Sequence, residues 1–198
     1  MLTSSDVDAI VTSLGRQALE DIEWSESVQP PATAEDFALE TIYVICNSGM
    51  RFTIARKIFD RVTGNLRAGL PASDAFGHAG KVEAIERIWR DRDALWRGYL
   101  EAPDKLAFCE SLPWIGKITK FHLAKNFGAN VAKPDVHLQR LADREGVTAQ
   151  ALCERLAAES GYRAATVDTL LWRACATGLL DSRTGEMRLK KENAPPTA

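Results

Sequence analysis

The amino-acid sequence predicts an all-α protein of about nine helices, arranged in two small lobes with a cleft between them. Apolar residues recur at intervals of three and four, the spacing of one face of an α-helix. No stretch of useful length alternates apolar and polar residues as a half-buried strand would. Groups of proline, glycine and asparagine separate the helical stretches. These three observations favour a bundle of short helices.

Capping and breaking residues set the expected helices in the first half of the chain. Ser5-Asp6 can cap the first helix, and the proline-bearing residues 29–33 form the connector that follows. Asn47-Ser48-Gly49 ends the second helix, and the third carries Phe52 and Ile54 on its apolar side. The expected helices lie near residues 5–14, 34–47, 52–66 and 82–96.

Five more helices are expected in the second half. Residues 104–112 and 116–127 form a pair joined by a short turn. Asp135 or Val136 begins the next helix, and Thr148 caps the one after it. The last helix fades at Gly178, which makes nine helices in all.

Length and composition indicate one compact domain, or two small helical lobes that share a core. A chain of 198 residues with 45% hydrophobic content can bury a sizeable interior without disulfides or metals. We expect a single domain over residues 1–182, on which an N-terminal arm, residues 1–33, packs. The last residues read Lys-Lys-Glu-Asn-Ala-Pro-Pro-Thr-Ala and are too polar to pack, so residues 183–198 are predicted to be a mobile tail.

The chain shows no targeting, membrane or cofactor signal. It starts Met-Leu-Thr-Ser-Ser-Asp, without a basic region or an apolar run, and no stretch approaches the roughly eighteen apolar residues of a membrane span. We therefore expect a cytoplasmic protein. The four cysteines form no Cys-x-x-Cys pair, so neither a metal site nor an iron–sulfur cluster is expected, and the thiols are predicted to be buried and reduced.

The formal net charge of −2 hides an uneven distribution. Residues 1–40 carry nine acidic side chains against Arg16 alone, which leaves the rest of the chain basic. A nucleic-acid partner would therefore meet a local basic surface, and the salt dependence of binding would be modest.

The most informative stretch runs from Leu112 to Leu138: Leu-Pro-Trp-Ile-Gly-Lys-Ile-Thr-Lys-Phe-His-Leu-Ala-Lys-Asn-Phe-Gly-Ala-Asn-Val-Ala-Lys-Pro-Asp-Val-His-Leu. A tight turn over residues 113–116 opens a helix rich in lysine, with no acidic residue until Asp135. Unpaired amides at such a helix start can bind a phosphate. The pattern predicts a phosphate clamp followed by a carboxylate that comes directly after a proline.

This stretch resembles the helix-hairpin-helix (HhH-GPD) DNA glycosylases. That family has a hairpin of the form Leu-Pro-Gly-(Val/Ile)-Gly and, about twenty residues later, an aspartate in a pattern such as Pro-Asp-Val-His. The resemblance covers about Glu110 to Leu141, and it implies excision of a base from DNA and a helix-hairpin-helix motif. One departure is Trp114, which stands where the family has its first hairpin glycine. If that position has a positive φ, the tryptophan is strained.

The resemblance implies that Asp135 is the catalytic carboxylate. It would activate a water and stabilise the positive charge that develops on deoxyribose as the glycosidic bond breaks. Asp135 also has the position of an ordinary helix N-cap, and the two roles are compatible.

Relatives that also nick the DNA backbone use a lysine two residues after the second hairpin glycine, and here that position is Ile118. Lys117 and Lys120 flank it but point about 100° and 200° away on a helix. The sequence therefore predicts a monofunctional enzyme that leaves an abasic site. Lys117 and Lys120 are interpreted as phosphate contacts, the alternative being solvated charges.

Five further candidates come from the resemblance. Asp168 and Trp172 are four residues apart and share a helix face, as in archaeal oxoguanine glycosylases, where such a pair holds the extruded base. The alternative is a helix-start aspartate and a core tryptophan. Asn47 and Met50 lie where relatives fill the gap left by the extruded nucleotide, with Arg51 placed to hold the orphaned partner or a phosphate. A plain turn explains the same residues.

The hypothesis is a monofunctional DNA glycosylase that acts as a monomer on double-stranded DNA. Its base is alkylated, mismatched or enzymatically modified, and glucosylated hydroxymethylcytosine of phage DNA is one possibility. The alternatives are a bifunctional 8-oxoguanine glycosylase/lyase and a non-catalytic DNA-binding module. Trp114 is expected either to contact deoxyribose or to pack beneath the turn. His137 is expected either to contact a phosphate or to form a hydrogen bond at the start of its helix. The residues expected to bind the DNA backbone are Trp114, Gly116, Lys117, Thr119, Lys120 and His137.

Overall fold

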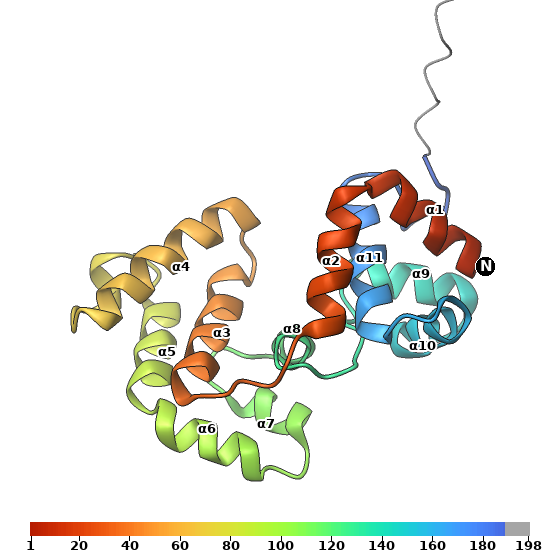
Figure 1. Cartoon of the computed structure of the whole chain (residues 1–198). Helices are drawn as coiled ribbons and strands as arrows, with labels where there is room; N and C mark the ends of the chain where they lie inside the picture. The colour runs from red at the N-terminus through yellow and green to blue at the C-terminus, as the bar shows by residue number, and fades with distance from the viewer. Residues whose placement is uncertain (189–198) are drawn as a thin grey trace, which may run out of the picture. The chain divides into compact units, whose positions relative to one another are not determined.

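The computed structural model describes residues 1–188, and this part of the chain is all-α, as predicted. It contains eleven α-helices, one short 3₁₀ helix and an isolated β-bridge. The chain divides into two compact units (Figure 1). The terminal unit comprises Met1–Ser27 together with the chain from Asn130 onward, and the central unit comprises Val28–Ala129.

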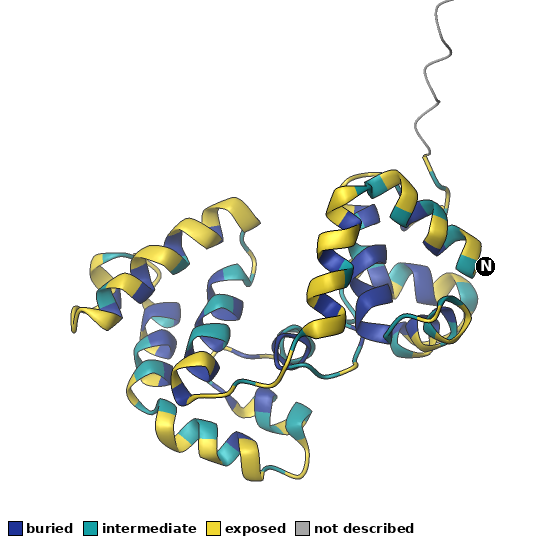
Figure 2. Cartoon of the chain, in the orientation of Figure 1, coloured by how far each residue is buried: buried dark blue, intermediate teal, exposed yellow. Residues whose placement is uncertain are grey.

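The terminal unit is built around its last helix, α11 (Ala164–Ala176). Every residue of α11 from Ala164 to Leu171 is buried (Figure 2) because four other helices contact it. Arg173 of α11 also makes a bidentate ion pair with Asp21, at 2.8 and 2.9 Å. The surrounding helices are α1 (Ser4–Leu14), α2 (Arg16–Ser27), α9 (Val136–Glu145) and α10 (Ala149–Ser160).

The central unit is built around α3 (Ala34–Asn47), which contacts α4, α5, α6 and α8. Aromatic rings fill its core: Phe37 stacks on Phe127 with ring centroids 5.2 Å apart and meets Tyr99 at 5.8 Å. The other helices are α4 (Phe52–Arg67), the 3₁₀ helix η1 (Ala72–Asp74), α5 (Ala79–Arg90), α6 (Arg92–Glu101), α7 (Lys105–Ser111) and α8 (Thr119–Asn126).

The prediction of about nine helices was too low for residues 1–188. Gly15, at φ 57°, ends α1, and a separate helix α2 follows before the connector. The helix expected near residues 82–96 is broken at Asp91, whose carboxylate binds Arg90 at 2.9 Å. The helix expected from Gly116 begins only at Thr119, because residues 116–118 belong to the turn.

Several local predictions are confirmed. Asp135 and Thr148 are the N-caps of α9 and α10, and each side chain accepts a backbone N–H. All four cysteines are buried free thiols, and burial raises the pKa of Cys109 to about 12.

The chain after α11 folds back on the terminal unit as far as it is described. Leu180 and Met187 form an antiparallel bridge, and Met187 packs against the core. A mobile tail was predicted for residues 183–198, and residues 189–198 of it lie outside the described part of the chain.

Candidate functional site

Asp135 caps α9 with only one of its two carboxylate oxygens. Oδ1 accepts the N–H of His137 at 2.9 Å and the N–H of Leu138 at 3.1 Å. Within residues 1–188 no donor reaches Oδ2, and the side chain is half-buried. The N-cap interpretation is therefore confirmed, and a second oxygen stays available to a water or a ligand.

His137 lies two residues beyond Asp135, and its ring is held by a residue that sequence reasoning missed. Nδ1 lies 3.1 Å from the hydroxyl oxygen of Ser182, which is itself buried. Ser182 belongs to the segment that folds back after α11. No local pattern points to this contact, because the two residues are 45 positions apart in the sequence.

Asp168 is buried within α11. Its side chain is 2% exposed, and Oδ1 accepts the backbone N–H of Lys133 at 2.9 Å. The carboxylate thus binds the segment that precedes Asp135, and its contact with an extruded base stays a prediction. Trp172 is half-buried against the core of the terminal unit, with the guanidinium of Arg173 5.2 Å from its ring.

The turn between α7 and α8 carries a strained tryptophan. Trp114 has φ 65°, and no other non-glycine residue in the described chain has a positive φ. Its indole Nε1 donates to Ser48 Oγ at 3.1 Å, and its ring meets the His78 ring edge-on at 5.1 Å. A Cβ on Gly80 would approach the tryptophan ring to 2.7 Å. The ring therefore packs on the start of α5 while 44% of the residue stays exposed.

After this turn, fewer groups are available to bind a phosphate than the sequence suggests. Lys120 makes an ion pair with Glu110, at 2.5 Å, so its charge is compensated within the protein. Gly116 donates its N–H to Thr119 Oγ1 at 2.7 Å, which removes one amide and one hydroxyl from the predicted set. Lys117 is exposed and forms no ion pair within residues 1–188. The backbone N–H groups at the start of α8 that remain without an acceptor in this part of the chain are those of residues 117–119.

A buried lysine holds the loop that follows α3. Lys81 is 3% exposed, and its Nζ donates to the carbonyl oxygens of Ser48, at 2.6 Å, and Cys46, at 3.3 Å. Burial lowers the pKa of Lys81. A cation at the carbonyl end of α3 is favourable for the helix dipole. Because Ser48 also accepts the indole N–H of Trp114, this loop and the 112–118 turn are held together.

The predicted stack-filling residues are not the most exposed ones in this region. Asn47 folds back onto its own helix, where Nδ2 donates to the Tyr43 carbonyl at 2.9 Å. Met50 is half-buried against the core, whereas Arg51 is exposed and forms no ion pair in the described chain. Phe52, the first residue of α4, is 58% exposed.

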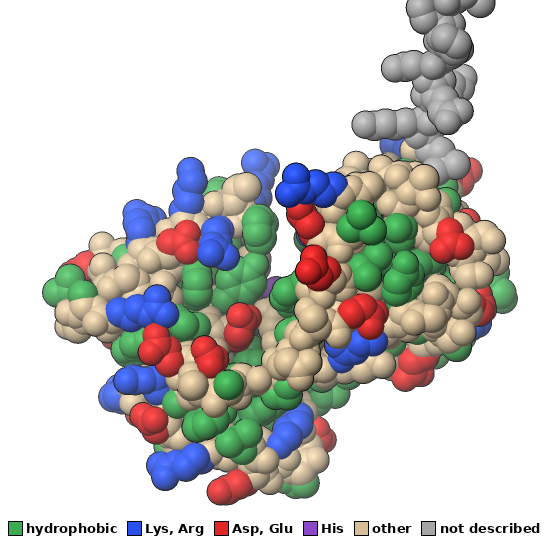
Figure 3. Space-filling model, viewed as in Figure 1, with side chains coloured by type: hydrophobic (Ala, Val, Ile, Leu, Met, Phe, Trp, Pro, Cys, Tyr) green, Lys and Arg blue, Asp and Glu red, His purple; other side chains and the backbone are tan. Residues whose placement is uncertain are grey.

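Phe52 and Ile54 were expected on the apolar side of their helix, and this expectation was wrong. The buried stripe of α4 consists of residues 55, 58, 62 and 66, and Ile54 is 51% exposed. The positions 52 and 54 lie on opposite edges of that stripe, about a quarter turn from its centre. Lysine and arginine side chains gather over α4 (Figure 3). The exposed basic residues along α4 and its N-cap are Arg51, Arg56, Lys57, Arg61 and Arg67.

The structure therefore groups the predicted residues by unit. The terminal unit contains Asp135, His137, Asp168 and Trp172, and the central unit contains the 47–51 loop and the 112–118 turn with the start of α8. Within the central unit, the hydrogen bond from Trp114 to Ser48 joins the 47–51 loop to the 112–118 turn.

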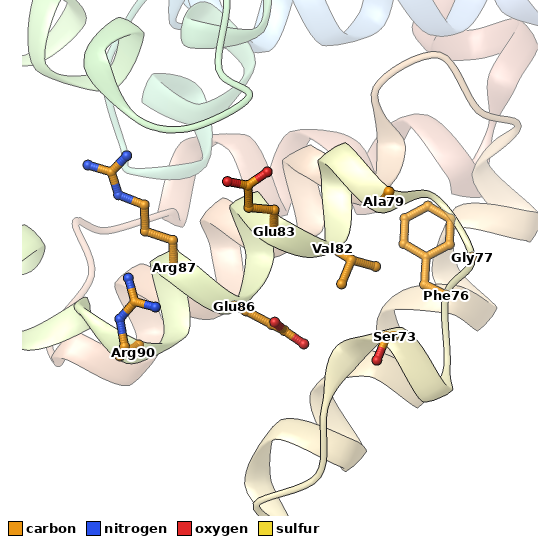
Figure 4. A pocket seen from close by; sticks show the side chains of 9 residues that line it. All are labelled: Ser73, Phe76, Gly77, Ala79, Val82, Glu83, Glu86, Arg87 and Arg90. Carbon is orange, nitrogen blue, oxygen red and sulfur yellow. The ribbon is translucent and has the colours of Figure 1, made fainter.

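The central unit also has a pocket of about 490 Å³ that contains no predicted site residue. It lies between η1 and α5, and Figure 4 shows Glu86 pointing toward the segment that carries Ser73. Glu86 accepts the backbone N–H of Ala72 at 2.9 Å, and Arg90 pairs with Asp91. Glu86 and Arg90 of this pocket thus bind other groups of the protein.

Two general features of the described residues bear on the site. No group of three or more His, Cys, Asp or Glu side chains in residues 1–188 could hold a metal ion. No helix in the same range combines the length and apolar character needed to cross a membrane. Comparison of the chain with protein-family models, curated proteins and solved structures gives no match.

Proposed function

We propose that the protein is a monofunctional DNA glycosylase that binds duplex DNA, extrudes one nucleotide and hydrolyses its N-glycosidic bond with Asp135 as the key carboxylate. The observation that carries this proposal is that the two carboxylate oxygens of Asp135 have different surroundings. Two backbone amides fix one oxygen, and the other oxygen has no donor within residues 1–188. A structural cap needs only the first of these oxygens.

This arrangement suits a carboxylate that must keep a fixed orientation while one of its oxygens stays available for the reaction. The bond between C1′ and the base nitrogen breaks, and its electron pair leaves with the base. In this mechanism Oδ2 stabilises the positive charge on the sugar and accepts a proton from the water that adds to C1′, and the departing base takes up a proton from solvent. The products are the neutral free base and an abasic site, and the carboxylate returns its proton to solvent. Because Oδ1 is already bound by two amides, little reorganisation is needed during the reaction.

Water is the proposed nucleophile because no lysine is positioned at the hairpin to form a Schiff base. The position that carries the nucleophilic lysine in bifunctional relatives is Ile118, which is 44% exposed. Lys120 is bound to Glu110, so its ammonium group is engaged within the protein and is not free to attack C1′. Lys117 is assigned to phosphate binding together with the free amides at the start of α8.

The central unit is proposed to grip the strand and to occupy the place of the extruded nucleotide. Lys117 and Arg51 are exposed cations without an ion pair in the described chain. Phe52 adjoins Arg51 and offers an exposed aromatic ring that can insert between base pairs, as apolar wedges do in other DNA-bending proteins. Phe52 therefore replaces Asn47 and Met50 as our first choice for the stack-filling residue.

The base that is removed is proposed by elimination. Oxoguanine is disfavoured because relatives that remove it carry the lysine that Ile118 replaces. Alkylated, mismatched and enzymatically modified bases remain, and glucosylated hydroxymethylcytosine of phage genomes belongs to the last group.

A second candidate function is a non-catalytic DNA-binding module. The observation that favours it is the ordinary N-cap geometry of Asp135 Oδ1, which a purely structural residue would share. The two functions differ in one product, the abasic site.

The experiment that separates them uses duplexes that carry one alkylated, oxidised, deaminated, mismatched or glucosylated base. After incubation with the protein, each duplex is tested for strand breaks with and without alkali. A glycosylase without lyase activity gives breaks only after alkali, and borohydride traps no covalent adduct. Binding of duplex DNA without alkali-labile sites on any of the duplexes would favour the binding module.

A further inference from the structure

The segment that leads into Asp135 is anchored by side chains of two other helices. Asn130 Oδ1 accepts the N–H of Ala165 at 3.0 Å and so joins the segment to the start of α11. Two further bonds run in the other direction, from the segment to side-chain acceptors. These are Ala132 N–H to Gln150 Oε1, at 2.7 Å, and Lys133 N–H to Asp168 Oδ1, at 2.9 Å.

The last of these bonds acts on Asp135 through a very short path. The N–H of Asp135 donates to the carbonyl of Lys133 at 2.7 Å, which closes a one-residue turn around Pro134. An i to i+2 bond of this kind defines a γ-turn, and proline already has a φ close to the one required by its common, inverse form. The peptide on either side of Lys133 is thus engaged, with its N–H held by Asp168 and its carbonyl held by Asp135. A shift of the Lys133 backbone therefore also moves the backbone of Asp135.

Asp168 itself is a rigid anchor. It lies in the fully buried half of α11, among residues that are at most 9% exposed. A buried carboxylate is tolerated only when it is hydrogen-bonded, and loss of one partner leaves an unsatisfied buried group. The sequence pattern had suggested that this carboxylate contacts an extruded base, which its burial does not favour.

We propose that Asp168 is a positioning residue that sets the place of the Asp135 carboxylate by holding the backbone of Lys133. This inference rests on the proposed function, because it concerns the carboxylate that the proposal makes catalytic. Misplacement of a reacting group by about 1 Å can cost roughly a hundredfold in rate. Loss of the Asp168 acceptor should therefore slow base release and leave duplex binding intact, since the DNA-binding residues proposed above lie in the central unit.

The test compares Asp168→Ala, which removes the acceptor, with Asp168→Asn, which keeps a carbonyl oxygen for the Lys133 N–H. The matched control is Thr166→Val in the same buried helix, where the lost hydroxyl binds Glu26 and Ser25 and does not touch the segment 130–135. Base release is measured in single-turnover experiments on the substrate duplex identified above. Affinity is measured on a duplex with a tetrahydrofuran abasic-site analogue.

We expect Asp168→Ala to lower the single-turnover rate by about 30- to 100-fold per folded molecule. The dissociation constant for the analogue duplex should change by less than about twofold. Asp168→Asn should restore the rate to within a few fold of wild type, and Thr166→Val should lower stability without slowing base release. Equal rates for Asp168→Ala and Thr166→Val would overturn the inference. Equal losses from the alanine and asparagine variants would also overturn it, because the charge rather than the acceptor would then matter.

Two further measurements keep the inference testable if Asp168→Ala does not fold or if the wild type releases no base. Gln150→Ala removes the neighbouring anchor at a half-buried position, and it should lower the single-turnover rate in the same direction by a smaller factor. Hydrogen exchange at the amides of Lys133 and Asp135 reports the anchoring without any activity. Protection that is lost in Asp168→Ala and kept in Asp168→Asn and Thr166→Val supports the inference, whereas exchange of both amides at unfolded rates in wild type would contradict it. Absence of base release from every duplex by wild type would instead count against the proposed function.

Discussion

Replacement of Trp114 by alanine and by glycine separates the strain of the 112–118 turn from the contacts that the ring makes. Both variants lose the packing on His78 and Gly80 and the hydrogen bond to Ser48. Only glycine adopts φ 65° without the steric cost that a Cβ carries in the left-handed region. We therefore expect the glycine variant to be the more stable of the two, although glycine is ordinarily the more destabilising substitution.

The magnitudes follow from exposure and backbone angle. An aromatic side chain buries about 150–250 Å² when it is packed, and Trp114 is 44% exposed, so about half of that area is buried. At about 25 cal/mol per Å², the ring contributes about 3 kcal/mol, and the partly exposed bond to Ser48 adds about 1 kcal/mol or less. Both variants should thus lose about 3 to 4 kcal/mol of the free energy of unfolding. The glycine variant should recover about 1 kcal/mol of this loss.

The control is Ile118, which is equally exposed at 44% but has φ −97°. There alanine should be more stable than glycine by about 0.5–1 kcal/mol, the usual order for a right-handed position. Urea denaturation of all four variants followed by circular dichroism gives the differences, provided that the slopes with denaturant agree. If Trp114→Ala were as stable as Trp114→Gly or more so, residue 114 would not be in the left-handed region and the described turn would be wrong.

Three further predictions concern binding and electrostatics. Phe52→Ala should weaken binding to a duplex with an abasic-site analogue by about tenfold, as expected for loss of one stacking ring. Leu100→Ala, which removes a residue of similar exposure (51%), should leave this affinity unchanged, and equal effects of the two would refute the wedge assignment. Lys117→Ala should lower the slope of log affinity against log salt by about one, and an unchanged slope would exclude a phosphate contact. Burial raises the pKa of Glu40, which accepts a bond from Asn126, so the folded state binds the Glu40 proton more tightly than the unfolded chain. Glu40→Gln should therefore raise the free energy of unfolding at pH 7, and this gain should shrink as the pH falls through the raised pKa of the folded state toward the ordinary value of 4.5 and be absent at lower pH. A gain that is constant across pH would contradict this explanation.

The features of the fold that depend on local chemistry could be predicted from the sequence. Asp135 and Thr148 were identified as helix caps because a side-chain oxygen at a helix start satisfies amides a few residues away. Trp114 was identified as a strained position because a tryptophan stood where the resemblance expected glycine, and its φ of 65° fits that reasoning. These inferences need only neighbouring residues.

The features that depend on tertiary packing could not be predicted in the same way. Phe52 and Ile54 belong to a helical apolar pattern by spacing, but the stripe that the core covers is centred between them. Lys120 follows the turn as an apparently free cation, yet Glu110 lies across from it once α7 and α8 pack together. Asp168 shares a helix face with Trp172, but the burial of α11 follows from four helices that meet it from distant parts of the chain.

The central claim is that Oδ2 of Asp135, which no donor reaches within residues 1–188, takes part in breaking the bond between base and sugar. The most direct measurement is the release of abasic sites by Asp135→Asn, which keeps a carbonyl oxygen to cap α9 and removes the negative charge. The account predicts that this variant folds, binds the analogue duplex with wild-type affinity and forms no alkali-labile sites above background. Base release by Asp135→Asn at the wild-type rate would contradict it.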